Sequence, residues 1–270
     1  MKQTNPARFG VERRENCMID VVLFDVGGTI HTVTNNEALR TAFAGRLRER
    51  LADYGINIDG DNREIGRRLH ENAEAYKHYS EETRAELPQK RIWNEFYLKD
   101  YRIGEERLAP IAEELSFLYD YERVRNLRRP HLAETLEALR RAGVRMGVVS
   151  NIISTSFVPH ILNEYGIAHY MDCVVLSSET GVRKSDPAAF DVALTKMGVS
   201  RARTAYVGDT ISRDVLGARN ANLALMILIG NPAVAHRDAA FIGSGLEPDF
   251  RIDDLAEIPG IIETYNRTHP

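Results

Sequence analysis

The first residue with catalytic potential is Asp25, an acid that is followed closely by two glycines. The uninterrupted apolar run of residues 21–24 predicts a buried strand of a parallel sheet, with Asp25 at its carboxyl end. Ligands of open α/β sheets bind at this edge, and Gly27 and Gly28 would let backbone groups approach them closely. Because Asp and Gly also form ordinary turns, the other strand ends must decide between a catalytic and a turn interpretation.

Polar side chains follow three later apolar runs of the sequence. They are Ser150 and Asn151 after residues 144–149, Lys184 in the loop after residues 173–176, and Asp209 after residues 204–207, with Asp214 five residues further on. In a parallel sheet these strand ends share one edge, so the side chains are expected to converge on a single crevice. A local turn does not explain such convergence.

Three of the converging residues, Asp25, Asp209 and Asp214, are carboxylates. Neighbouring carboxylates repel one another, and they stay ionised at neutral pH only if cations compensate their charge. Lys184 supplies one positive charge. A divalent cation with oxygen ligands would supply more, and Mg²⁺ favours a few carboxylates together with water and substrate phosphate.

The elements that must position these residues alternate regularly along the second half of the chain. Predicted strands at 144–149, 173–176, 204–207, 225–229 and 249–252 are separated or followed by helical patterns near 157–165, 187–198, 215–220 and 258–265. This alternation predicts an α/β fold with a doubly wound parallel sheet and helices on both of its faces.

A long helical interval separates the first two strands. Several amphipathic patterns and no convincing strand lie between them, whereas a plain crossover usually needs only one helix. We therefore expect a polar N-terminal arm at 1–17, an α/β core domain at 18–31 and 126–270, and an inserted helical domain at 32–125.

The composition excludes several classes of protein. The 270 residues are 43% hydrophobic and carry a formal charge of −4, so we expect neither nucleic acid nor a membrane as partner. The first sixteen residues contain no continuous apolar segment, and Cys17 and Cys173 form neither a metal motif nor a disulfide framework. A reducing, cytoplasmic location is expected, and the sequence does not indicate an oligomeric state.

The ordered motifs DxxGT, SN, GxxK and GDxxxxD resemble those of the haloacid dehalogenase superfamily, a group of hydrolases with an aspartate nucleophile. The resemblance extends from about residue 18 to 265. It includes the position of the helical insertion, which is similar to the C1-type cap domain of one class of the superfamily. It implies a Rossmann-like core domain and a substrate that is a small phosphorylated metabolite.

The resemblance also implies a role for each matching residue. Asp25 would be the nucleophile that forms an aspartyl phosphate. Mg²⁺ would be held by Asp25, the Gly27 carbonyl and Asp209, with Asp214 supporting the site. The remaining matches would contact or neutralise the phosphoryl group or border its site; they are Gly28, Thr29, Ser150, Asn151 and Lys184.

One position departs from the phosphatases of the superfamily. They usually carry a second aspartate two residues after the nucleophile, which protonates the leaving group, and here that position is Gly27. General acid and base catalysis is worth about 10² to 10⁴ in rate. Members that cleave carbon–halogen or carbon–phosphorus bonds also lack this aspartate, but dehalogenating members tend to lose the equivalent of Asp209. The phosphatase interpretation is favoured, and a dehalogenase or phosphonatase-type hydrolase, or a weakly catalytic binding or regulatory protein, is the alternative.

Two further interpretations depend on single residues or short patterns. His31 could replace the missing acid, although a histidine at this position is more often a solvated loop residue. Trp93, Phe96 and Tyr97 are spaced as the core of a helical domain rather than as a substrate platform.

Overall fold

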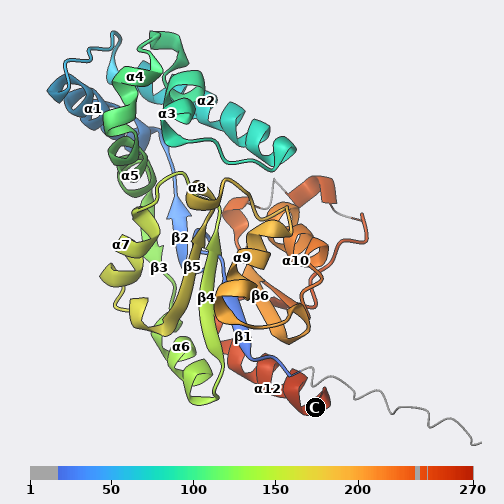
Figure 1. Cartoon of the computed structure of the whole chain (residues 1–270). Helices are drawn as coiled ribbons and strands as arrows, with labels where there is room; N and C mark the ends of the chain where they lie inside the picture. The colour runs from blue at the N-terminus through green and yellow to red at the C-terminus, as the bar shows by residue number, and fades with distance from the viewer. Residues whose placement is uncertain (1–17, 235–237, 242, 270) are drawn as a thin grey trace, which may run out of the picture.

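The computed structural model describes residues 18–234, 238–241 and 243–269 (Figure 1). The predicted arm at 1–17 lies outside these residues. Within the described chain, six parallel strands form one sheet in the order β5-β4-β1-β6-β7-β8. The strands are β1 (Val21–Phe24), β4 (Arg145–Ser150), β5 (Met171–Leu176), β6 (Thr204–Gly208), β7 (Leu225–Ile229) and β8 (Phe250–Ile252). The predicted doubly wound α/β sheet is confirmed.

Helices cover both faces of this sheet, which explains why its strands read as continuous apolar runs. One face packs against α6 (Leu132–Arg141), α7 (Phe157–Glu164) and α12 (Ile258–Thr268). The other face packs against α9 (Ala188–Met197) and α10 (Leu216–Asn220). Along β1 the side chains alternate between the two cores, with Val22 and Phe24 in the first and Val21 and Leu23 in the second. All four are fully buried.

The position of β1 in the sheet brings the site residues together. It pairs with β4 on one side and β6 on the other, so Asp25 lies between the strand ends that carry Ser150 and Asp209. The short helix α8 (Ser177–Thr180) follows β5 and leads to Lys184. The order of the strands therefore brings together, at one edge of the sheet, residues that are separated by nearly two hundred positions in the sequence.

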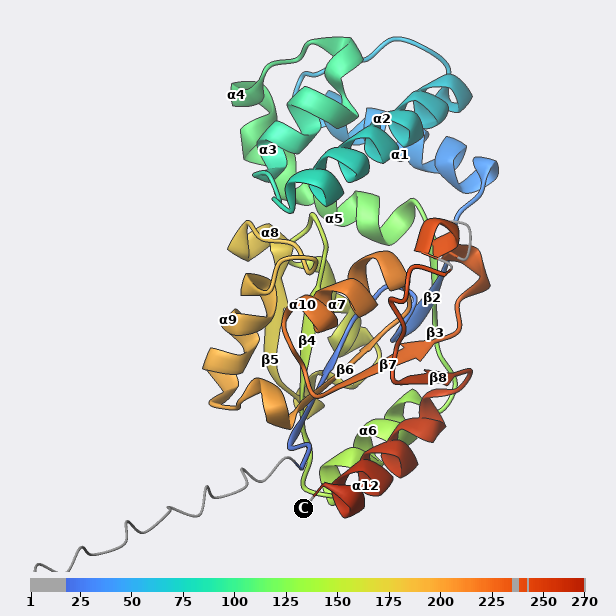
Figure 2. The same cartoon turned by 90° about the vertical axis from the view of Figure 1, so that its right-hand side faces the viewer.

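A second, helical layer lies over the carboxyl edge of the sheet (Figure 2). Its elements are α1 (Glu37–Asp53), α2 (Asn62–Thr83), α3 (Gln89–Arg91), a π-helical turn (Ile92–Tyr97), α4 (Glu105–Leu108) and α5 (Ala112–Glu122). It has a hydrophobic core of its own, in which Trp93 and Tyr97 are buried and the Trp93 indole donates to Ser116 Oγ at 3.0 Å. The interpretation of these aromatic residues as core is confirmed for both.

The helical layer is attached to the sheet by contacts beside the site. Ala85 forms an antiparallel bridge with Val182. The buried Glu86 carboxylate accepts hydrogen bonds from Arg183 Nη1 and Ser177 Oγ, both at 2.6 Å. Because Arg183 directly precedes Lys184, this buried ion pair fixes the backbone at that lysine.

The boundaries of the helical layer contain a structure that the sequence analysis missed. β2 (His31–Thr34) and β3 (Arg125–Arg128) form an antiparallel pair, in which His31 lies opposite Arg128 and Thr34 opposite Arg125. The expectation of no strand between the first two core strands is therefore wrong. Both strands are four residues long and mostly polar, so neither has an apolar pattern that identifies it.

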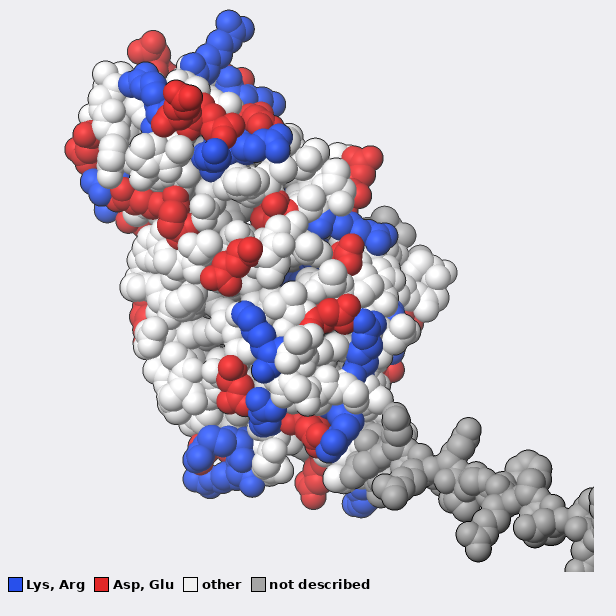
Figure 3. Space-filling model, in the orientation of Figure 1, with Lys and Arg blue, Asp and Glu red and all other residues white. Residues whose placement is uncertain are grey.

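The surface of the molecule carries charges of both signs. On the face drawn in Figure 3, acidic and basic side chains are interspersed over the helical layer and the sheet domain. Among the described residues, no helix combines the length and the apolar character needed to cross a membrane.

Candidate active site

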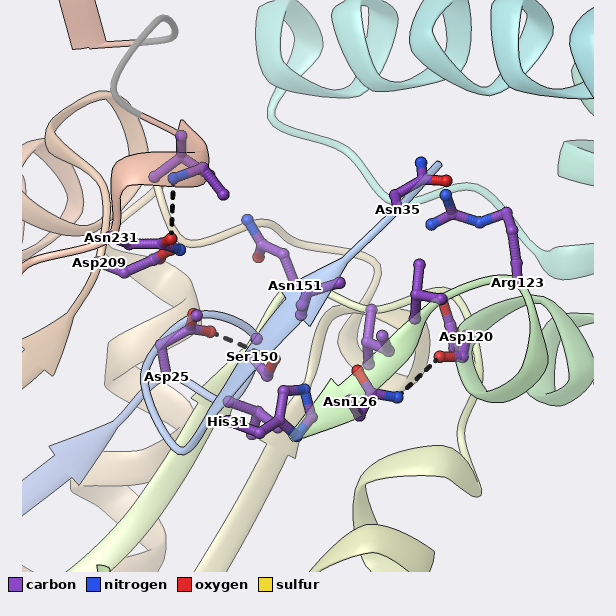
Figure 4. Close-up of a pocket in the computed structure, with 18 of the residues that line it drawn as sticks. Asp25, His31, Asn35, Asp120, Arg123, Asn126, Ser150, Asn151, Asp209 and Asn231 are labelled. Carbon is purple, nitrogen blue, oxygen red and sulfur yellow. Dashed lines mark hydrogen bonds between the residues drawn. The ribbon is translucent and has the colours of Figure 1, made fainter. Parts of the chain in front are cut away.

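A cavity of about 630 Å³ lies between the edge of the sheet and the helical layer. Its sheet side includes Asp25, Ser150, Asn151, Lys184 and Asp209, and its helical side includes Arg40, His70, Glu74, Asp120 and Arg123. Figure 4 shows Asp25 and Asp209 on one side of this cavity and Asp120 and Arg123 on the other. The predicted convergence of the strand ends is thus present in the structure.

Lys184 bridges two of the carboxylates. Its ammonium Nζ lies 2.6 Å from Asp25 Oδ1 and 2.6 Å from Asp214 Oδ1, and all three side chains are almost fully buried. Asp25 Oδ1 also accepts a hydrogen bond from Ser150 Oγ at 3.3 Å. Among the described residues, the other oxygen of Asp25 has no hydrogen-bond partner, so it is available to a ligand.

Asn151 holds the lysine from its backbone side. Its side-chain oxygen accepts a hydrogen bond from the Lys184 backbone N–H at 2.9 Å. The amide group of Asn151 lines the cavity and points into it in Figure 4. It can therefore donate to a ligand.

Asp214 is saturated by hydrogen-bond donors. Oδ1 accepts from Lys184 Nζ at 2.6 Å and from the Tyr206 hydroxyl at 2.9 Å. Oδ2 accepts from the Thr210 hydroxyl at 2.6 Å and from the backbone N–H groups of Thr210 and Asp209 at 3.0 and 3.3 Å. Asp214 therefore holds Lys184 and the loop after β6 in place, and its oxygens have little capacity left for a ligand.

Asp209 differs from Asp214 because one of its oxygens is unpaired. Oδ2 accepts a hydrogen bond from the Asn231 amide at 2.6 Å, whereas Oδ1 is buried and has no hydrogen-bond partner among the described residues. Gly28 makes the close approach of this side chain possible. A Cβ at Gly28, where φ is +92°, would lie 1.9 Å from Asp209 Oδ2.

The free oxygens of Asp25 and Asp209 fit a divalent cation, with the saturated Asp214 beside them. One oxygen from each of Asp25, Asp209 and Asp214 can be chosen so that all three lie within 4.8 Å of one another. An unpaired buried carboxylate oxygen is costly unless it binds a cation or a donor, and Asp209 Oδ1 is such an atom. The donor set of hard oxygen atoms is the one that Mg²⁺ prefers.

The pKa shifts at the site follow from burial and from the pattern of contacts. Burial raises the pKa of Asp25 although Lys184 opposes this effect. Burial and the charges of Asp214 and Asp25 raise the pKa of Asp209 to about 7. Burial alone would also raise the pKa of Asp214, but Lys184 and Arg213 hold it below its usual range. The protein's own cations thus compensate Asp214 and leave Asp25 and Asp209 short of positive charge.

Two residues named in the sequence analysis lie elsewhere than expected. Thr29 is fully buried, its hydroxyl has no hydrogen-bond partner among the described residues, and it is not part of the cavity lining. His31 is 1% exposed, lies in β2 and lines the cavity, so its interpretation as a solvated loop residue is wrong. Burial lowers the pKa of His31 to about 4, and its Nδ1 lies 3.3 Å from the Tyr165 hydroxyl. The imidazole is therefore neutral at pH 7.

Two residues of the cavity lining were not predicted from the sequence, and a third residue contacts the backbone beside the cavity. Asn231 fixes Asp209, Arg213 lines the cavity beside the carboxylates, and the Arg129 guanidinium donates to the carbonyls of Gly28 and Gly230. Asn231 follows β7 at the same edge as the other site residues, so the rule of strand ends would have found it. No local pattern distinguishes Arg129 or Arg213 from the other arginines of the chain.

Comparison with known proteins agrees with this geometry. A family model described as haloacid dehalogenase-like hydrolase matches residues 19–222. The chain belongs to the haloacid dehalogenase-like hydrolases. The matched region contains all of the site residues predicted from the sequence, from Asp25 to Asp214. The chain is therefore a hydrolase of this family.

Individual relatives cover different shares of the chain. It is 28% identical over 256 residues to a phosphoglycolate phosphatase of Vibrio vulnificus. This alignment covers 90% of this chain and 96% of the relative. It is 33% identical over 133 residues to a glyceraldehyde 3-phosphate phosphatase of Methanothermobacter thermautotrophicus, where the match spans 49% of this chain and 58% of the relative. A crystal structure of a 2-haloacid dehalogenase from Pseudomonas syringae shares the fold, with a TM-score of 0.61, 22% identity, and coverage of 92% and 100%.

Proposed function

We propose that this haloacid dehalogenase-like hydrolase is a Mg²⁺-dependent phosphatase, which acts on a small phosphorylated metabolite through an aspartyl phosphate at Asp25. The observation that carries the proposal is the state of the Asp25 carboxylate. One oxygen is held by Lys184 and Ser150, while the other faces the cavity without a hydrogen-bond partner among the described residues. The relatives named as phosphatases support this bond type over a carbon–halogen bond.

In the proposed reaction, Asp25 and Lys184 act on the same phosphoryl group. The carboxylate of Asp25 attacks phosphorus, the bond to the leaving oxygen breaks, and an aspartyl phosphate forms. Water then cleaves this intermediate and releases inorganic phosphate. Lys184 would neutralise negative charge on the nucleophile and on the transferring group, and Ser150 and the Asn151 amide, which line the cavity, would donate hydrogen bonds to the phosphoryl oxygens.

Asp25, Asp209 and the Gly27 carbonyl would hold the metal, and Asp214 would support it through the loop after β6. A bound Mg²⁺ would supply positive charge next to the phosphoryl oxygens. The unpaired oxygen of Asp209 supports this assignment. Thr29 stays a predicted site residue, although its buried position favours a structural contribution to the loop after β1.

The domain division that we propose follows the sequence prediction. Residues 18–31 and 126–270 would form the core domain, and residues 32–125 would form a cap whose closure excludes bulk water from the cavity. The separate hydrophobic core of the helical layer supports this division. A cytoplasmic location also stays a prediction.

The test is the release of inorganic phosphate from an aryl phosphate and from an alkyl phosphate, with and without Mg²⁺. An aryl leaving group departs without protonation, so it reports attack by Asp25 even where no general acid is present. We expect Mg²⁺-dependent release that is lost in Asp25→Asn. No release from either ester would contradict the phosphatase proposal and favour cleavage of another bond or a binding protein.

A further inference from the structure

The helical side of the cavity carries two arginines that the proposed chemistry does not use. Arg40 lies in the first turn of α1, and Arg123 directly follows α5. Both line the same cavity as Asp25. Figure 4 shows Arg123 beside Asn35, across the cavity from Asp25 and Asp209. His70 lines the cavity with them, and burial together with the charges of Arg40 and Arg123 lowers the pKa of this histidine.

Neither guanidinium has an acidic partner among the described residues. In the part of the chain that the structure describes, neither forms an ion pair or a side-chain hydrogen bond, and Arg123 Nε is buried without a partner. Other arginines of the helical layer are paired, such as Arg46 of α1 with Glu122 of α5 and Arg67 with Glu71 within α2. A buried donor without a partner is costly, so the guanidinium of Arg123 is suited to a ligand.

Two acidic residues, Glu74 and Asp120, line the cavity near these two charges, and neither forms an ion pair with Arg40 or Arg123 among the described residues. Glu74 lies 3.5 Å from Lys77 and forms an ion pair with it. Burial raises the pKa of Asp120 to about 8, although Arg123 opposes the shift, so burial weakens the negative charge of this carboxyl group. The ring of Tyr119 lies 4.1 Å from the Arg123 guanidinium carbon and holds the group in position. The helical side of the cavity therefore keeps a positive charge.

The cavity has room for more than a phosphoryl group. Its volume of about 630 Å³ is within the range of sites for organic ligands, and its two ends differ in chemistry. The sheet end provides a nucleophile and the proposed metal ligands. The helical end provides two planar guanidinium groups, whose donor geometry matches a carboxylate or a phosphate.

We propose that the substrate of this enzyme is a phosphate monoester with a second anionic group at the end remote from the scissile bond, and that Arg40 and Arg123 bind this group. The proposal rests on the proposed function for the position of the phosphoryl group. The second anion is a carboxylate or a phosphate. An uncharged aldehyde or alcohol at the same end would leave both guanidinium groups unpaired.

The test compares the binding of matched ligands to the Asp25→Asn protein with Mg²⁺ present, by titration calorimetry. The ligands are ω-phosphonooxy carboxylates of two to five carbons, the α,ω-bisphosphates of the same lengths, and the corresponding ω-hydroxyalkyl phosphates. Binding does not require turnover. Phosphate release from an aryl ester by the wild-type protein is measured separately, so a failure of the proposed function is distinguished from a failure of this inference.

We expect the best carboxylate or bisphosphate to bind about 10- to 100-fold more tightly than the matched alcohol, since charge-assisted hydrogen bonds are the stronger class. Whichever of the two anions binds more tightly identifies the class of the second group. The combined Arg40→Gln and Arg123→Gln changes should remove this preference, whereas Arg123→Lys should retain part of it. Arg67→Gln, at an exposed arginine of α2, is the matched control and should retain all of it.

Two results would overturn the inference. One is equal affinity for charged and uncharged ends at every chain length. The other is a preference for the anion that survives in the double variant. Thermal unfolding of each variant shows whether it is folded, and Arg123→Lys provides the comparison if the double variant is not.

Discussion

Gly27→Asp should convert this protein into a faster alkyl phosphatase. The proposed function leaves the reaction without a general acid, because position 27 has no side chain. Gly27 is exposed at the cavity, and a Cβ built on its backbone meets no atom within 4 Å. Its φ angle also lies outside the left-handed region. The Cβ of an aspartate can therefore be placed here without a clash, and the backbone is not in the left-handed conformation that would strain it.

The expected gain follows from the chemistry of the leaving group. A positioned acid is worth about 10² to 10⁴ in rate, which corresponds to about 3 to 5 kcal/mol of activation free energy. The neighbouring carboxylates of Asp25 and Asp209 would raise the pKa of the new carboxyl group and keep more of it protonated. An aryl phosphate needs no protonation, so its rate should change by only a few-fold.

The assay measures kcat/KM for an alkyl and an aryl phosphate in the wild type, Gly27→Asp and Gly27→Asn. Asparagine has the same size as aspartate but cannot act as a general acid, so it controls for occupation of the space. The reasoning is refuted if the aryl rate is retained in Gly27→Asp and the alkyl rate does not rise above that of Gly27→Asn. Another group would then already protonate the leaving oxygen.

Three further changes test other parts of the structure. His31→Gln should reduce the loss of stability at acid pH. The imidazole of the unfolded chain binds a proton below about pH 6.5, whereas that of the folded protein binds one only below about pH 4, so the wild type loses up to about 3 kcal/mol of unfolding free energy as the pH falls through this range. Denaturant titrations of both proteins at pH 4 and pH 7 measure this difference. Glu86→Gln leaves Arg183 buried without its counterion and should lower the free energy of unfolding by about 3 to 5 kcal/mol. Adding Arg183→Met to this variant should restore part of the lost stability. If the destabilisations of the two single variants simply add in the double variant, the ion-pair argument is contradicted. Gly28→Ala places a Cβ 1.9 Å from Asp209 Oδ2 and forces alanine into a φ of +92°. We expect this variant to lose about 1 to 3 kcal/mol of stability and at least tenfold in Mg²⁺-dependent phosphate release. Unchanged phosphate release would show that the close approach of Gly28 to Asp209 is not needed.

The sequence was sufficient to predict the core sheet and the edge at which the site lies. Its strands are buried on both faces, so they appear as continuous apolar runs that are visible without any tertiary information. The residues directly after these runs include Asp25, Ser150 and Asp209, and the parallel topology brings them together. The positions of these residues after apolar runs, together with the rule that parallel strands share their carboxyl edge, thus predicted most of the residues on the sheet side of the cavity.

The helical side of the cavity could not be predicted in this way. Arg40, Asp120 and Arg123 lie on or beside amphipathic helices, where charged residues are normally solvated. Whether such a residue faces water or a cavity depends on how the helical layer packs over the sheet. The same reason explains His31, whose burial depends on β2, Phe157 and Tyr165 rather than on its neighbours in sequence.

The sequence by itself determined the fold class, the family and the set of groups at the strand ends, because local apolar patterns and short motifs encode these properties. Only the tertiary structure decided which carboxylate oxygens are saturated and which are free, as the comparison of Asp214 with Asp209 shows. It also decided that Arg40 and Arg123 line the same cavity as Asp25 and Asp209. These features depend on contacts between residues that are far apart in sequence, and such contacts leave no local pattern.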